Sequence, residues 1–332
     1  MAAKLVLITG ATGFIGFRIL LDVLKAGHRV RVVVRSREKA DSLSHHPKLK
    51  DHYERARFDF SLVQDFAELG AWDEALRDVT HIMHVASPLP LPFLNPQKDI
   101  YEPSTQGNDN LLLAALRTTN LERIILTSSI VATMPLAPRS QGPYNATTVV
   151  DDPAGPFENV YDAYQAAKIH LLRASREIVE RHAPRFDVIS ILPGYTFGRN
   201  EMAQSATQMF TSSNAVLLML LQGKKFPVDR ITGVAHLDDV AAVHVCALDQ
   251  SIKGNSIYGV SVSAEYNKAI AITRNHFPDA FEKGIFADGD QPSEIIEWNA
   301  TDTETKLGMK FKRFEEMVVD VVAQYLNLMK DE

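Results

Sequence analysis

Residues 4–39 read KLVLITGATGFIGFRILLDVLKAGHRVRVVVRSREK, and this stretch decides the fold. The apolar segment Lys4–Thr9 is too short for a helix and is followed by glycine, which favours a strand. Apolar residues then recur at helical spacing over Phe14–Lys25, and Gly27 is a usual helix stop. The β-branched run Arg29–Val34 predicts a second strand. Strand, glycine turn, helix and strand form a βαβ unit, which implies a right-handed crossover and two parallel strands.

The same alternation of strands and helices continues along the chain. The further elements expected are strands at Thr80–Val85, Arg123–Thr127 and Asp187–Leu192, and helices at Asp109–Arg117 and Tyr161–Arg181. Strands that alternate with helices favour a doubly wound parallel sheet with helices on both faces, so the expected fold class is α/β of the Rossmann type. The stretch Pro135–Phe157, rich in Pro, Gly and Asn, is expected to be a long loop.

The region after Gly198 has a different, mainly helical pattern. It contains one apolar stretch that predicts a last strand, Ser256–Val260, and it ends in a helix near Phe314–Met329. The expected division is residues 1–198, with 229–260 returning to them, for the Rossmann domain, and residues 199–228 and 261–332 for a smaller, mostly helical substrate-binding lobe. A cleft between the sheet and this lobe is the expected ligand site.

Composition and charge exclude several classes of protein. The chain has 332 residues, of which 45% are hydrophobic and 23% charged, an ordinary globular balance. A net charge of -6 gives no general attraction for nucleic acid or for an anionic membrane surface. Cys246 is the only cysteine, so no intrachain disulfide can form and a reducing compartment is expected. Glycines interrupt the apolar stretch Lys4–Phe17, which argues against a signal peptide and favours a cytoplasmic protein.

Thr9–Gly16 reads TGATGFIG and has the TGxxGxxG pattern of a dinucleotide-binding turn. Its three glycines allow a tight turn, close approach of the backbone to a pyrophosphate, and tight packing of helix on strand. The helix N-terminus then presents free N–H groups and a positive dipole end to the phosphates. The residues expected to contact the cofactor here are Gly10, Thr12, Gly13, Phe14, Ile15 and Gly16.

The residue after the second strand chooses between the two nicotinamide cofactors. NAD sites usually place Asp or Glu here to bind the ribose hydroxyls, whereas this chain has Arg35. A guanidinium can bind the 2′-phosphate of NADP(H) with two hydrogen bonds and stack on adenine. We therefore expect NADP(H), bound by Arg35 and Lys39, with Arg37 as a rim contact. Glu38 argues against this preference, and a solvated basic turn is the alternative interpretation.

Tyr164 and Lys168 form a YxxxK pattern within the expected helix Tyr161–Arg181. The i,i+4 spacing puts both side chains on one helical face, where the ammonium can favour the phenolate form of a group whose ordinary pKa is about 10. Thr127-Ser128-Ser129 follows an expected strand, at the carboxyl edge where open α/β sheets bind ligands. A hydroxyl there can polarise a substrate carbonyl. Each pattern alone has a purely structural explanation: the Tyr can simply pack on the Lys side chain, and the Ser/Thr cluster can simply cap a strand. Together the patterns predict a catalytic site.

These residues belong to a resemblance that runs nearly the length of the chain. The sequence resembles the extended short-chain dehydrogenase/reductases, in the branch of dihydroflavonol-reductase-like proteins and yeast NADPH-dependent aldehyde and ketone reductases. Besides the motifs quoted above, the segments that carry it are Asp59-Phe60, His84–Pro88 (HVASP), Leu126–Ser129 (LTSS), Leu192–Gly198 (LPGYTFG), Val234–Ala241 (VAHLDDVA) and Asp302–Gly308 (DTETKLG).

The resemblance implies a role for each matched residue. Tyr164 would donate a proton to a carbonyl oxygen, Lys168 would hold the nicotinamide ribose and lower the pKa of Tyr164, and Ser129 would polarise the carbonyl. Ser128 would be structural. The further cofactor contacts implied are Asp59 and Phe60 at the adenine, Val85, Ala86 and Ser87 along the dinucleotide, and Pro193 at the nicotinamide. The reaction implied is NADPH-dependent reduction of an aldehyde or ketone to the alcohol.

The segments expected to line the cleft are apolar and aromatic, with no cluster of Arg or Lys. This composition suits a small, largely apolar carbonyl compound, of which aromatic and polyketide-like ones are examples. The residues expected to contact the substrate are Ser87, Pro88, Phe93, Tyr161, Tyr195 and Phe197. The alternative is that many of these apolar side chains form the core of the lobe.

Two other functions remain open from the sequence. An NAD-dependent sugar-nucleotide epimerase or dehydratase would need a carboxylate near residue 35 and a basic site for a diphosphate, and Arg35 argues against the first. A non-catalytic NADP-binding sensor would share the fold but commonly loses the Tyr or the Lys, whereas Ser129, Tyr164 and Lys168 are all present. We expect no nucleic-acid or membrane partner and no metal, and the sequence leaves monomer and homodimer open.

Overall fold

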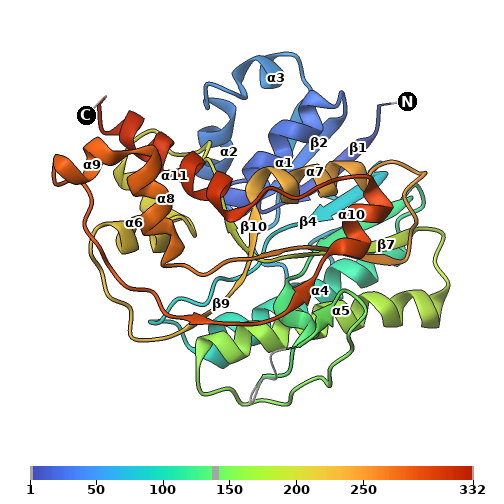
Figure 1. Ribbon diagram of the computed structural model, residues 1–332. Helices are drawn as coiled ribbons and strands as arrows, with labels where there is room; N and C mark the ends of the chain where they lie inside the picture. The colour runs from blue at the N-terminus through green and yellow to red at the C-terminus, as the bar shows by residue number, and fades with distance from the viewer. Residues whose placement is uncertain (1–2, 137–141, 331–332) are drawn as a thin grey trace.

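A parallel sheet forms the centre of the molecule. The structure, a computed structural model, describes residues 3–136 and 142–330. One sheet has seven strands in the order β11-β7-β5-β4-β1-β2-β3, and every neighbouring pair is parallel. Their bounds are β1 Leu5–Thr9, β2 Arg29–Val34, β3 Phe58–Leu62, β4 His81–His84, β5 Arg123–Thr127, β7 Asp187–Pro193 and β11 Ser256–Val260. The strand order reverses between β1 and β4 (Figure 1), which is the switch point where such sheets bind ligands.

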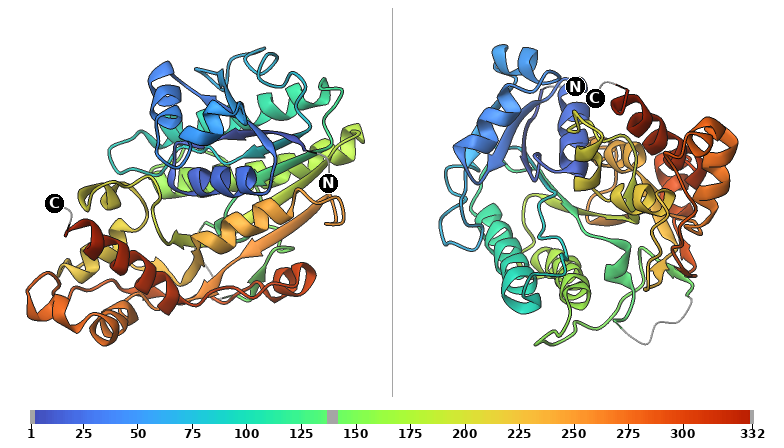
Figure 2. Two further views of the ribbon diagram at one scale, coloured as in Figure 1. Left: turned by 90° about the horizontal axis from the view of Figure 1, so that it is seen from above. Right: turned by 90° about the vertical axis from the view of Figure 1, so that its left-hand side faces the viewer.

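Helices cover both faces of the sheet because its central strands are buried on both sides. Every residue of β4 and of β5 is buried. On one face pack α1 (Phe14–Lys25) and α7 (Leu237–Cys246), and on the other α4 (Glu102–Leu116) and α5 (Val160–His182), as Figure 2 shows. Shorter helices in this part are α2 (Arg37–Ser44), α3 (Lys50–Glu54) and α10 (Thr301–Leu307). Within residues 3–136 and 142–330, no helix combines the length and apolarity required to cross a bilayer.

The Rossmann-type fold expected from the sequence is confirmed. The prediction lacks β3, because a short strand that contains Asp and Ser has a weak apolar signal. α4 begins at Glu102 rather than at the expected Asp109, because Pro103 and Gly107 obscure the helical period at its start. In its described part, the expected loop Pro135–Phe157 is irregular apart from the short strand β6 (Tyr144–Asn145).

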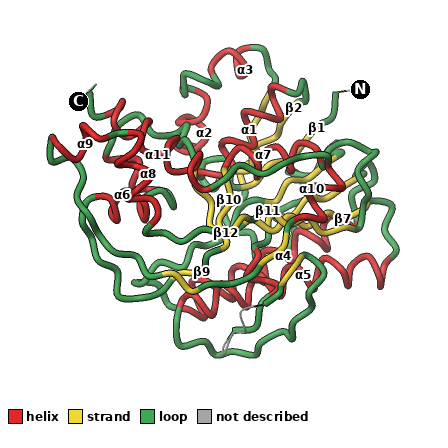
Figure 3. Tube along the Cα trace, in the orientation of Figure 1, coloured by secondary structure: helices red, strands yellow, loops and turns green. Residues whose placement is uncertain are grey.

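The helices that follow residue 198 gather beside the sheet and have a core of their own. α6 (Ala215–Leu221), α8 (Lys268–His276), α9 (Pro278–Glu282) and α11 (Phe314–Leu328) lie together at the left of Figure 1; we call them the lobe. A small sheet next to the lobe consists of β8 (Tyr195–Phe197), β10 (Gly233–His236) and β12 (Val262–Ser263). Two further strand pairs are β9 (Arg230–Ile231) with β13 (Ser293–Glu294), and β6 with β14 (Trp298–Asn299). Figure 3 shows β9 apart from the main sheet.

Charged side chains hold the lobe against the sheet. Asp238, in the first turn of α7, pairs with Arg18 of α1 (Oδ1 to Nη1, 2.7 Å) and with Lys312 (Oδ2 to Nζ, 2.6 Å). His236 accepts a hydrogen bond from the backbone N–H of Asp238 and bonds to Asp320 of α11 at 3.2 Å. The ligand atoms of His236, Asp238 and Asp320 lie within 4.8 Å of one another, as they would around a metal ion. Because two cations already neutralise Asp238, this cluster is an ion-pair junction.

A second ion pair, formed by a buried arginine, ties the central strands to the chain that follows α7. Arg123 of β5 is 5% exposed and bonds both carboxylate oxygens of Asp187 on β7, at 2.6 and 2.9 Å. Its other N–H groups donate to the backbone carbonyls of Ala247, Asp249 and Ile252 at 2.7 to 2.9 Å. All the donors of this guanidinium are thus used, so its loss would leave the Asp187 carboxylate and the carbonyls of Ala247 and Ile252 without this partner.

Replacing Arg123 with Met is expected to lower the free energy of unfolding by about 3–5 kcal/mol, because the partly buried carboxylate of Asp187 and the carbonyls beside it lose their shared partner. Urea unfolding measures this change. Arg117→Met is the matched control: Arg117 pairs with Asp73 at 2.9 Å between side chains that are 60% and 64% exposed. Its loss should cost less than about 1 kcal/mol. Equal effects of the two substitutions would contradict the role assigned to Arg123.

Candidate active site

The turn after β1 lies against the end of β4 with no space between them. Gly10 has a φ of +73°, and a Cβ placed on it would lie 2.7 Å from the backbone nitrogen of Ala86. A Cβ placed on Gly16 would overlap the carbonyl oxygen of Gly10. Only glycine fits at either position, so the turn, the strand end and α1 form one close-packed unit.

The N-terminus of α1 faces the same edge of the sheet. Gly13 caps the helix without a side chain, and its first turn contains neither Asp nor Glu. The first backbone N–H groups therefore have no side-chain acceptor within this turn, and the helix dipole is positive here. This arrangement suits a pyrophosphate at the predicted residues, which are Gly10, Thr12, Gly13, Phe14, Ile15 and Gly16.

A chain of hydrogen bonds fixes the ends of β1 and β4. The Thr9 hydroxyl accepts hydrogen bonds from the backbone N–H groups of Val85 and Ala86, both at 3.1 Å. It also bonds to Nδ1 of His84 at 3.0 Å, and Nε2 of His84 bonds to Oδ1 of Asn108 at 2.8 Å. Since the Thr9 oxygen accepts twice, its proton goes to Nδ1, and the imidazole is neutral with its own proton on Nε2. In agreement, burial lowers the pKa of His84 to about 4.

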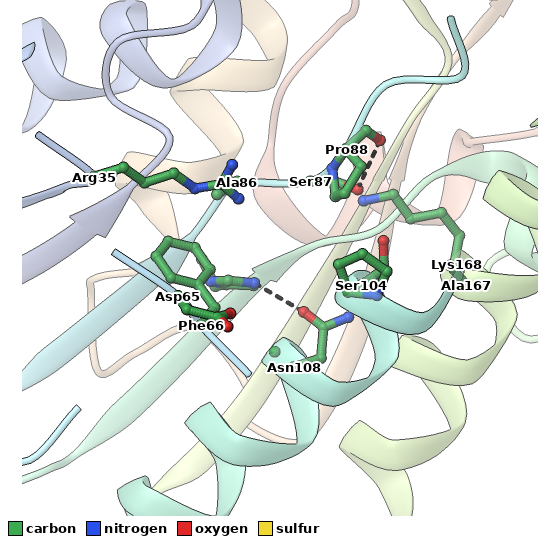
Figure 4. Close-up of a pocket in the computed structure, with 13 residues that line it drawn as sticks. Arg35, Asp65, Phe66, Ala86, Ser87, Pro88, Ser104, Asn108, Ala167 and Lys168 are labelled. Atoms are coloured by element: carbon green, nitrogen blue, oxygen red, sulfur yellow. Dashed lines mark hydrogen bonds between the residues drawn. The ribbon is translucent and has the colours of Figure 1, made fainter. Parts of the chain in front are cut away.

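A pocket opens at this edge of the sheet, between Arg35 and Lys168 (Figure 4). Arg35 extends into it from the end of β2, and its guanidinium carbon lies 5.3 Å from the centre of the Phe66 ring. Of the predicted cofactor residues, Ala86 and Ser87 also line the pocket. In the described ranges Arg35 has no ion-pair partner, so a cation supported by an aromatic ring is available to a phosphate group.

The adenine contacts implied by the resemblance, Asp59 and Phe60, are not among the residues that line this pocket. Asp59 is the second residue of β3, and its carboxylate accepts a hydrogen bond from Nε of Arg31 on β2 at 3.1 Å. Phe60 packs on neighbouring aromatic rings and is not part of the pocket lining. β3 continues beyond Phe60, and the residues that line the pocket after its carboxyl end are Asp65 and Phe66. The chain therefore has two Asp-Phe pairs, and the second one reaches the site.

The basic residues after Arg35 belong to α2. The Ser36 hydroxyl caps this helix by accepting the backbone N–H of Lys39 at 3.4 Å. Arg37, Glu38 and Lys39 therefore stand in the first turn of α2, and all three are exposed. Arg35 lines the pocket, and Lys39 does not.

Tyr164 and Lys168 of α5 lie at the carboxyl ends of β5 and β7. The Lys168 ammonium donates to the backbone carbonyl of Thr127 at 2.9 Å and lies 5.5 Å from the centre of the Tyr164 ring. The Ser129 hydroxyl lies 3.4 Å from the backbone carbonyl oxygen of Pro193 and within hydrogen-bond reach of the Tyr164 phenol, whose pKa it lowers. The structure thus brings Ser129, Tyr164, Lys168 and Pro193 to one place.

Buried hydrogen bonds fix the carbonyl that holds Lys168. Ser128 is 3% exposed, and its hydroxyl donates to the backbone carbonyl of Lys168 at 3.3 Å. The Thr127 hydroxyl bonds to Nε2 of His244 at 2.8 Å, and Nδ1 of His244 lies 2.7 Å from the carbonyl oxygen of Val240. Ser128 therefore ties the strand end to α5, while His244 holds Thr127 from the other side.

Burial sets the protonation states of the catalytic pair. It raises the pKa of Tyr164 to about 12, against the smaller lowering by the Ser129 hydroxyl. It lowers the pKa of Lys168 to about 8. At neutral pH the phenol therefore keeps its proton and the lysine keeps its charge, so Tyr164 is in the form that can donate a proton. Burial, rather than Lys168, is the dominant influence on Tyr164.

The predicted substrate residues lie at different depths. Ser87 and Pro88 line the pocket. Phe93 and Tyr161 are 81% and 52% exposed, so they are surface residues. Tyr195 is half-buried and lies near the catalytic tyrosine, whose pKa it raises.

Phe197 does not reach the pocket, contrary to the prediction. Its side chain is 0% exposed, and its ring centre lies 5.3 to 6.3 Å from those of Tyr195, Tyr266 and Phe314. It is part of the core of the lobe, which is the alternative considered for these aromatic residues. The reason is that β8 packs against the lobe, whose buried apolar side chains surround Phe197.

The sequence prediction missed the pocket residues Asp65, Phe66 and Asn108. The signal for the first two was the repeated Asp-Phe pair, which is decisive only once the end of β3 is known. The signal for Asn108 was weaker: it stands four residues after Ser104 on α4, and both are buried although polar. A buried polar pair at helical spacing indicates a hydrogen-bond partner inside the fold, which here is His84.

Two buried histidines should make stability depend on pH. Burial lowers the pKa of His84 and of His244 from 6.5 to about 4. Between these values the unfolded chain binds more protons than the folded one, so stability falls as pH falls from 6.5 towards 4. The loss at a pH of about 5.5 is about 1 kcal/mol for each histidine.

Thermal unfolding between about pH 7 and pH 5 measures this slope. His84→Gln and His244→Gln should each make it shallower, whereas the exposed control His182→Gln should leave it unchanged. If both buried variants kept the full slope, the neutral state assigned to these histidines would be wrong.

The chain is similar to known proteins over almost its whole length. Residues 6–261 match the model of the NAD dependent epimerase/dehydratase family. Ketoreductase CTB6 of Cercospora nicotianae is 34% identical over 345 aligned residues, which cover 99% of this chain and 96% of that protein. The NAD-dependent epimerase/dehydratase ALT6 of Alternaria alternata is 34% identical over 260 residues, which cover 74% of this chain and 73% of that protein.

A solved structure has the same fold. That of the yeast methylglyoxal/isovaleraldehyde reductase Gre2 complexed with NADPH has a TM-score of 0.83 at 23% identity, covering 99% of this chain and 100% of that one. The family resemblance read from the sequence motifs is confirmed. The chain therefore belongs to the NAD dependent epimerase/dehydratase family, the extended short-chain dehydrogenase/reductases.

Proposed function

We propose that the protein is an NADPH-dependent carbonyl reductase that converts an aldehyde or ketone to the alcohol. The observation that carries this proposal is the meeting of Ser129, Tyr164 and Lys168 at the carboxyl edge of the sheet. Because the hydroxyls of Ser129 and Tyr164 are within hydrogen-bond reach of each other, one carbonyl oxygen can contact both. The similarity to a ketoreductase over nearly the whole chain supports the reaction class.

The residues at the switch point fit NADP(H). Gly10 and the uncapped N-terminus of α1 leave room and N–H donors for a pyrophosphate. Arg35 stands where NAD sites place a carboxylate, and it is exposed above the Phe66 ring. A 2′-phosphate there would accept two charge-assisted hydrogen bonds. The yeast reductase with the same fold is described in complex with NADPH, which supports the choice of cofactor.

The catalytic side chains have complementary tasks in this reaction. When bound, NADPH would supply the hydride to the carbonyl carbon. Tyr164 would donate its proton to the carbonyl oxygen, and Ser129 would donate a hydrogen bond to that oxygen as negative charge develops on it. Lys168 would donate a hydrogen bond to the nicotinamide ribose, and its charge would stabilise the tyrosinate left behind.

The proposed substrate is a small, largely apolar carbonyl compound. Pro88 in the pocket lining and the half-buried Tyr195 beside the catalytic tyrosine support an apolar binding region. Phe93 and Tyr161 offer exposed apolar surface. Aromatic and polyketide-like ketones are the examples that fit such surroundings.

A sugar-nucleotide epimerase or dehydratase is the second candidate, because the family model and the Alternaria relative bear such a name. Such an enzyme uses NAD, and the exposed guanidinium of Arg35 in place of a carboxylate favours NADPH instead. A non-catalytic sensor is disfavoured because Ser129, Tyr164 and Lys168 are present and close together.

We further propose that residues 1–198 with 229–260 bind the cofactor, and that residues 199–228 and 261–332 supply substrate contacts. The supporting observation is that β11 joins the main sheet, whereas the lobe helices have a separate core. A cytoplasmic location, the absence of a nucleic-acid partner and a monomeric or homodimeric state stay predictions.

Tyr164→Phe is expected to lower kcat/KM for ketone reduction by about 10²–10⁴-fold, because it removes the proton donor. NADPH oxidation over a panel of aldehydes, ketones and diketones measures this. Tyr53→Phe is the control, since Tyr53 is 45% exposed and far along the chain from the catalytic helix. The affinity for NADPH should be the same in the wild type, in Tyr164→Phe and in Tyr53→Phe. Full activity of the Tyr164 variant would contradict the proposed mechanism.

Arg35→Ala is expected to lower kcat/KM for NADPH by about 10–100-fold, the effect of losing charge-assisted hydrogen bonds, while NADH is used as before. Initial rates with each cofactor give the ratio. Arg37→Ala tests an exposed arginine of α2 that does not line the pocket, and it should change the ratio less than about 3-fold. An unchanged NADPH preference in Arg35→Ala would remove this residue from the cofactor site.

A further inference from the structure

An arginine lies across a tyrosine from the catalytic residues. Arg230 belongs to the short strand β9, and its guanidinium carbon lies 5.4 Å from the centre of the Tyr195 ring. Arginine keeps its charge at every pH at which the protein is folded, and stacking on a ring is one of the ways in which a guanidinium is oriented. Arg230 is not among the residues that the sequence predicted around the substrate, which lie in apolar and aromatic segments.

Arg230 is held by a side chain that is itself fixed. Its Nε donates to Oε1 of Gln291 at 3.1 Å, and Gln291 is 0% exposed. The side-chain amide of Gln291 donates to the carbonyls of Val228 and Pro292, both at 2.9 Å, and its backbone N–H donates to Oδ1 of Asn267 at 2.8 Å. With Nε occupied and the ring beneath it, the guanidinium has a defined direction.

The remaining amino groups of Arg230 are available. Within the described ranges, neither Nη1 nor Nη2 of Arg230 has a hydrogen-bond or ion-pair partner. Arg274 differs in this respect, because it lies over Phe281 and also pairs with Asp288 at 2.8 Å. A half-buried guanidinium with two free amino groups presents the fork that binds a carboxylate with two hydrogen bonds.

Tyr195 connects this guanidinium with the residues of the reaction site. Tyr195 follows Pro193 by two residues, and the carbonyl of Pro193 is hydrogen-bonded by Ser129. In the small sheet Tyr195 pairs with Val234 of β10, the strand that follows β9. Tyr195 is also near enough to Tyr164 to raise the pKa of that phenol. Tyr195 therefore separates Arg230 from the point where a carbonyl oxygen would be protonated.

We propose that Arg230 is a specificity-determining residue that binds a carboxylate of the substrate, so that the preferred substrate is a keto acid with an apolar body. This inference rests on the proposed carbonyl reduction and names its substrate class. The apolar surroundings would hold the body, the Tyr195 ring would pack against it, and the Arg230 fork would fix its acidic end. The distance between the ketone and the carboxylate would then decide which keto acid fits.

Matched pairs of acid and ester test this class. The probes are benzoylformate, 3-benzoylpropionate and 4-benzoylbutyrate, each with its methyl ester, and the readout is NADPH-dependent kcat/KM. The wild type is expected to prefer at least one acid to its ester by about 10-fold or more, the effect of one charge-assisted contact. Arg230→Met should lose that preference, through a fall of about 10–100-fold on the acid and less than about 3-fold on the ester.

Two control variants separate charge recognition from support of the ring. Arg274→Met removes another ring-stacked arginine of the lobe, which lies 4.0 Å from the centre of the Phe281 ring, and should leave both rates unchanged. Arg230→Lys keeps the charge without the fork and should retain part of the acid preference. A second readout is inhibition of ester reduction by 3-phenylpropionate, which carries no ketone; it should be competitive in the wild type and absent in Arg230→Met.

The outcomes distinguish this inference from the proposed function. If the wild type reduces the esters but no acid better than its ester, the inference is overturned and the carbonyl reductase stands. If Arg230→Met slows acid and ester equally, Arg230 only supports Tyr195, which also overturns it. If no ketone is reduced, the proposed function fails, and calorimetry with 3-phenylpropionate decides the inference: binding lost in Arg230→Met supports it, and no binding to the wild type ends it.

Discussion

The backbone of Gly10 lies directly against the backbone of Ala86, and the rest of the site depends on this contact. It sets the end of β1 beside the end of β4 at the point where the strand order reverses. Because no side chain stands between them, the N-terminus of α1 opens onto the same edge. Thr9 and His84 then fix both strand ends with buried hydrogen bonds. A dinucleotide site of this kind therefore depends on glycines, which have no side chain, as much as on the side chains that form hydrogen bonds.

Burial determines the protonation states of the predicted catalytic residues at the same edge of the sheet. Tyr164 and Lys168 are four residues apart on α5, and burial moves their pKa values in opposite directions, to about 12 and about 8. Both shifts favour the neutral form, yet at neutral pH only the lysine stays charged. The phenol is then a proton donor next to a cation that can stabilise its conjugate base, which is the arrangement that carbonyl reduction requires.

Sequence reasoning recovered the first βαβ unit almost residue for residue because glycine turns and β-branched runs are local signals. The residues that it predicted as catalytic, Ser129, Tyr164 and Lys168, lie close together in the structure, because their spacing along a helix and after a strand fixes their neighbours. It did not single out Asp65 and Phe66, which line the pocket, because the sequence alone did not show that β3 continues beyond Asp59 and Phe60. Phe197 shows a second limit of sequence reasoning. The sequence does not indicate whether an aromatic residue in a strand faces the substrate or packs in the core of the lobe, as Phe197 does.

Deuterium transfer is the most direct test of the carbonyl reductase. The protein would be incubated with NADPH that carries deuterium at both hydrogens of C4 of the nicotinamide, together with a panel of aryl ketones and keto acids, and the product alcohol examined by mass spectrometry and NMR. We predict an alcohol with one deuterium on the carbinol carbon and none exchanged from it into water. NADPH that binds tightly, with no deuterated alcohol formed from any member of the panel, would contradict the assignment of the protein as a carbonyl reductase.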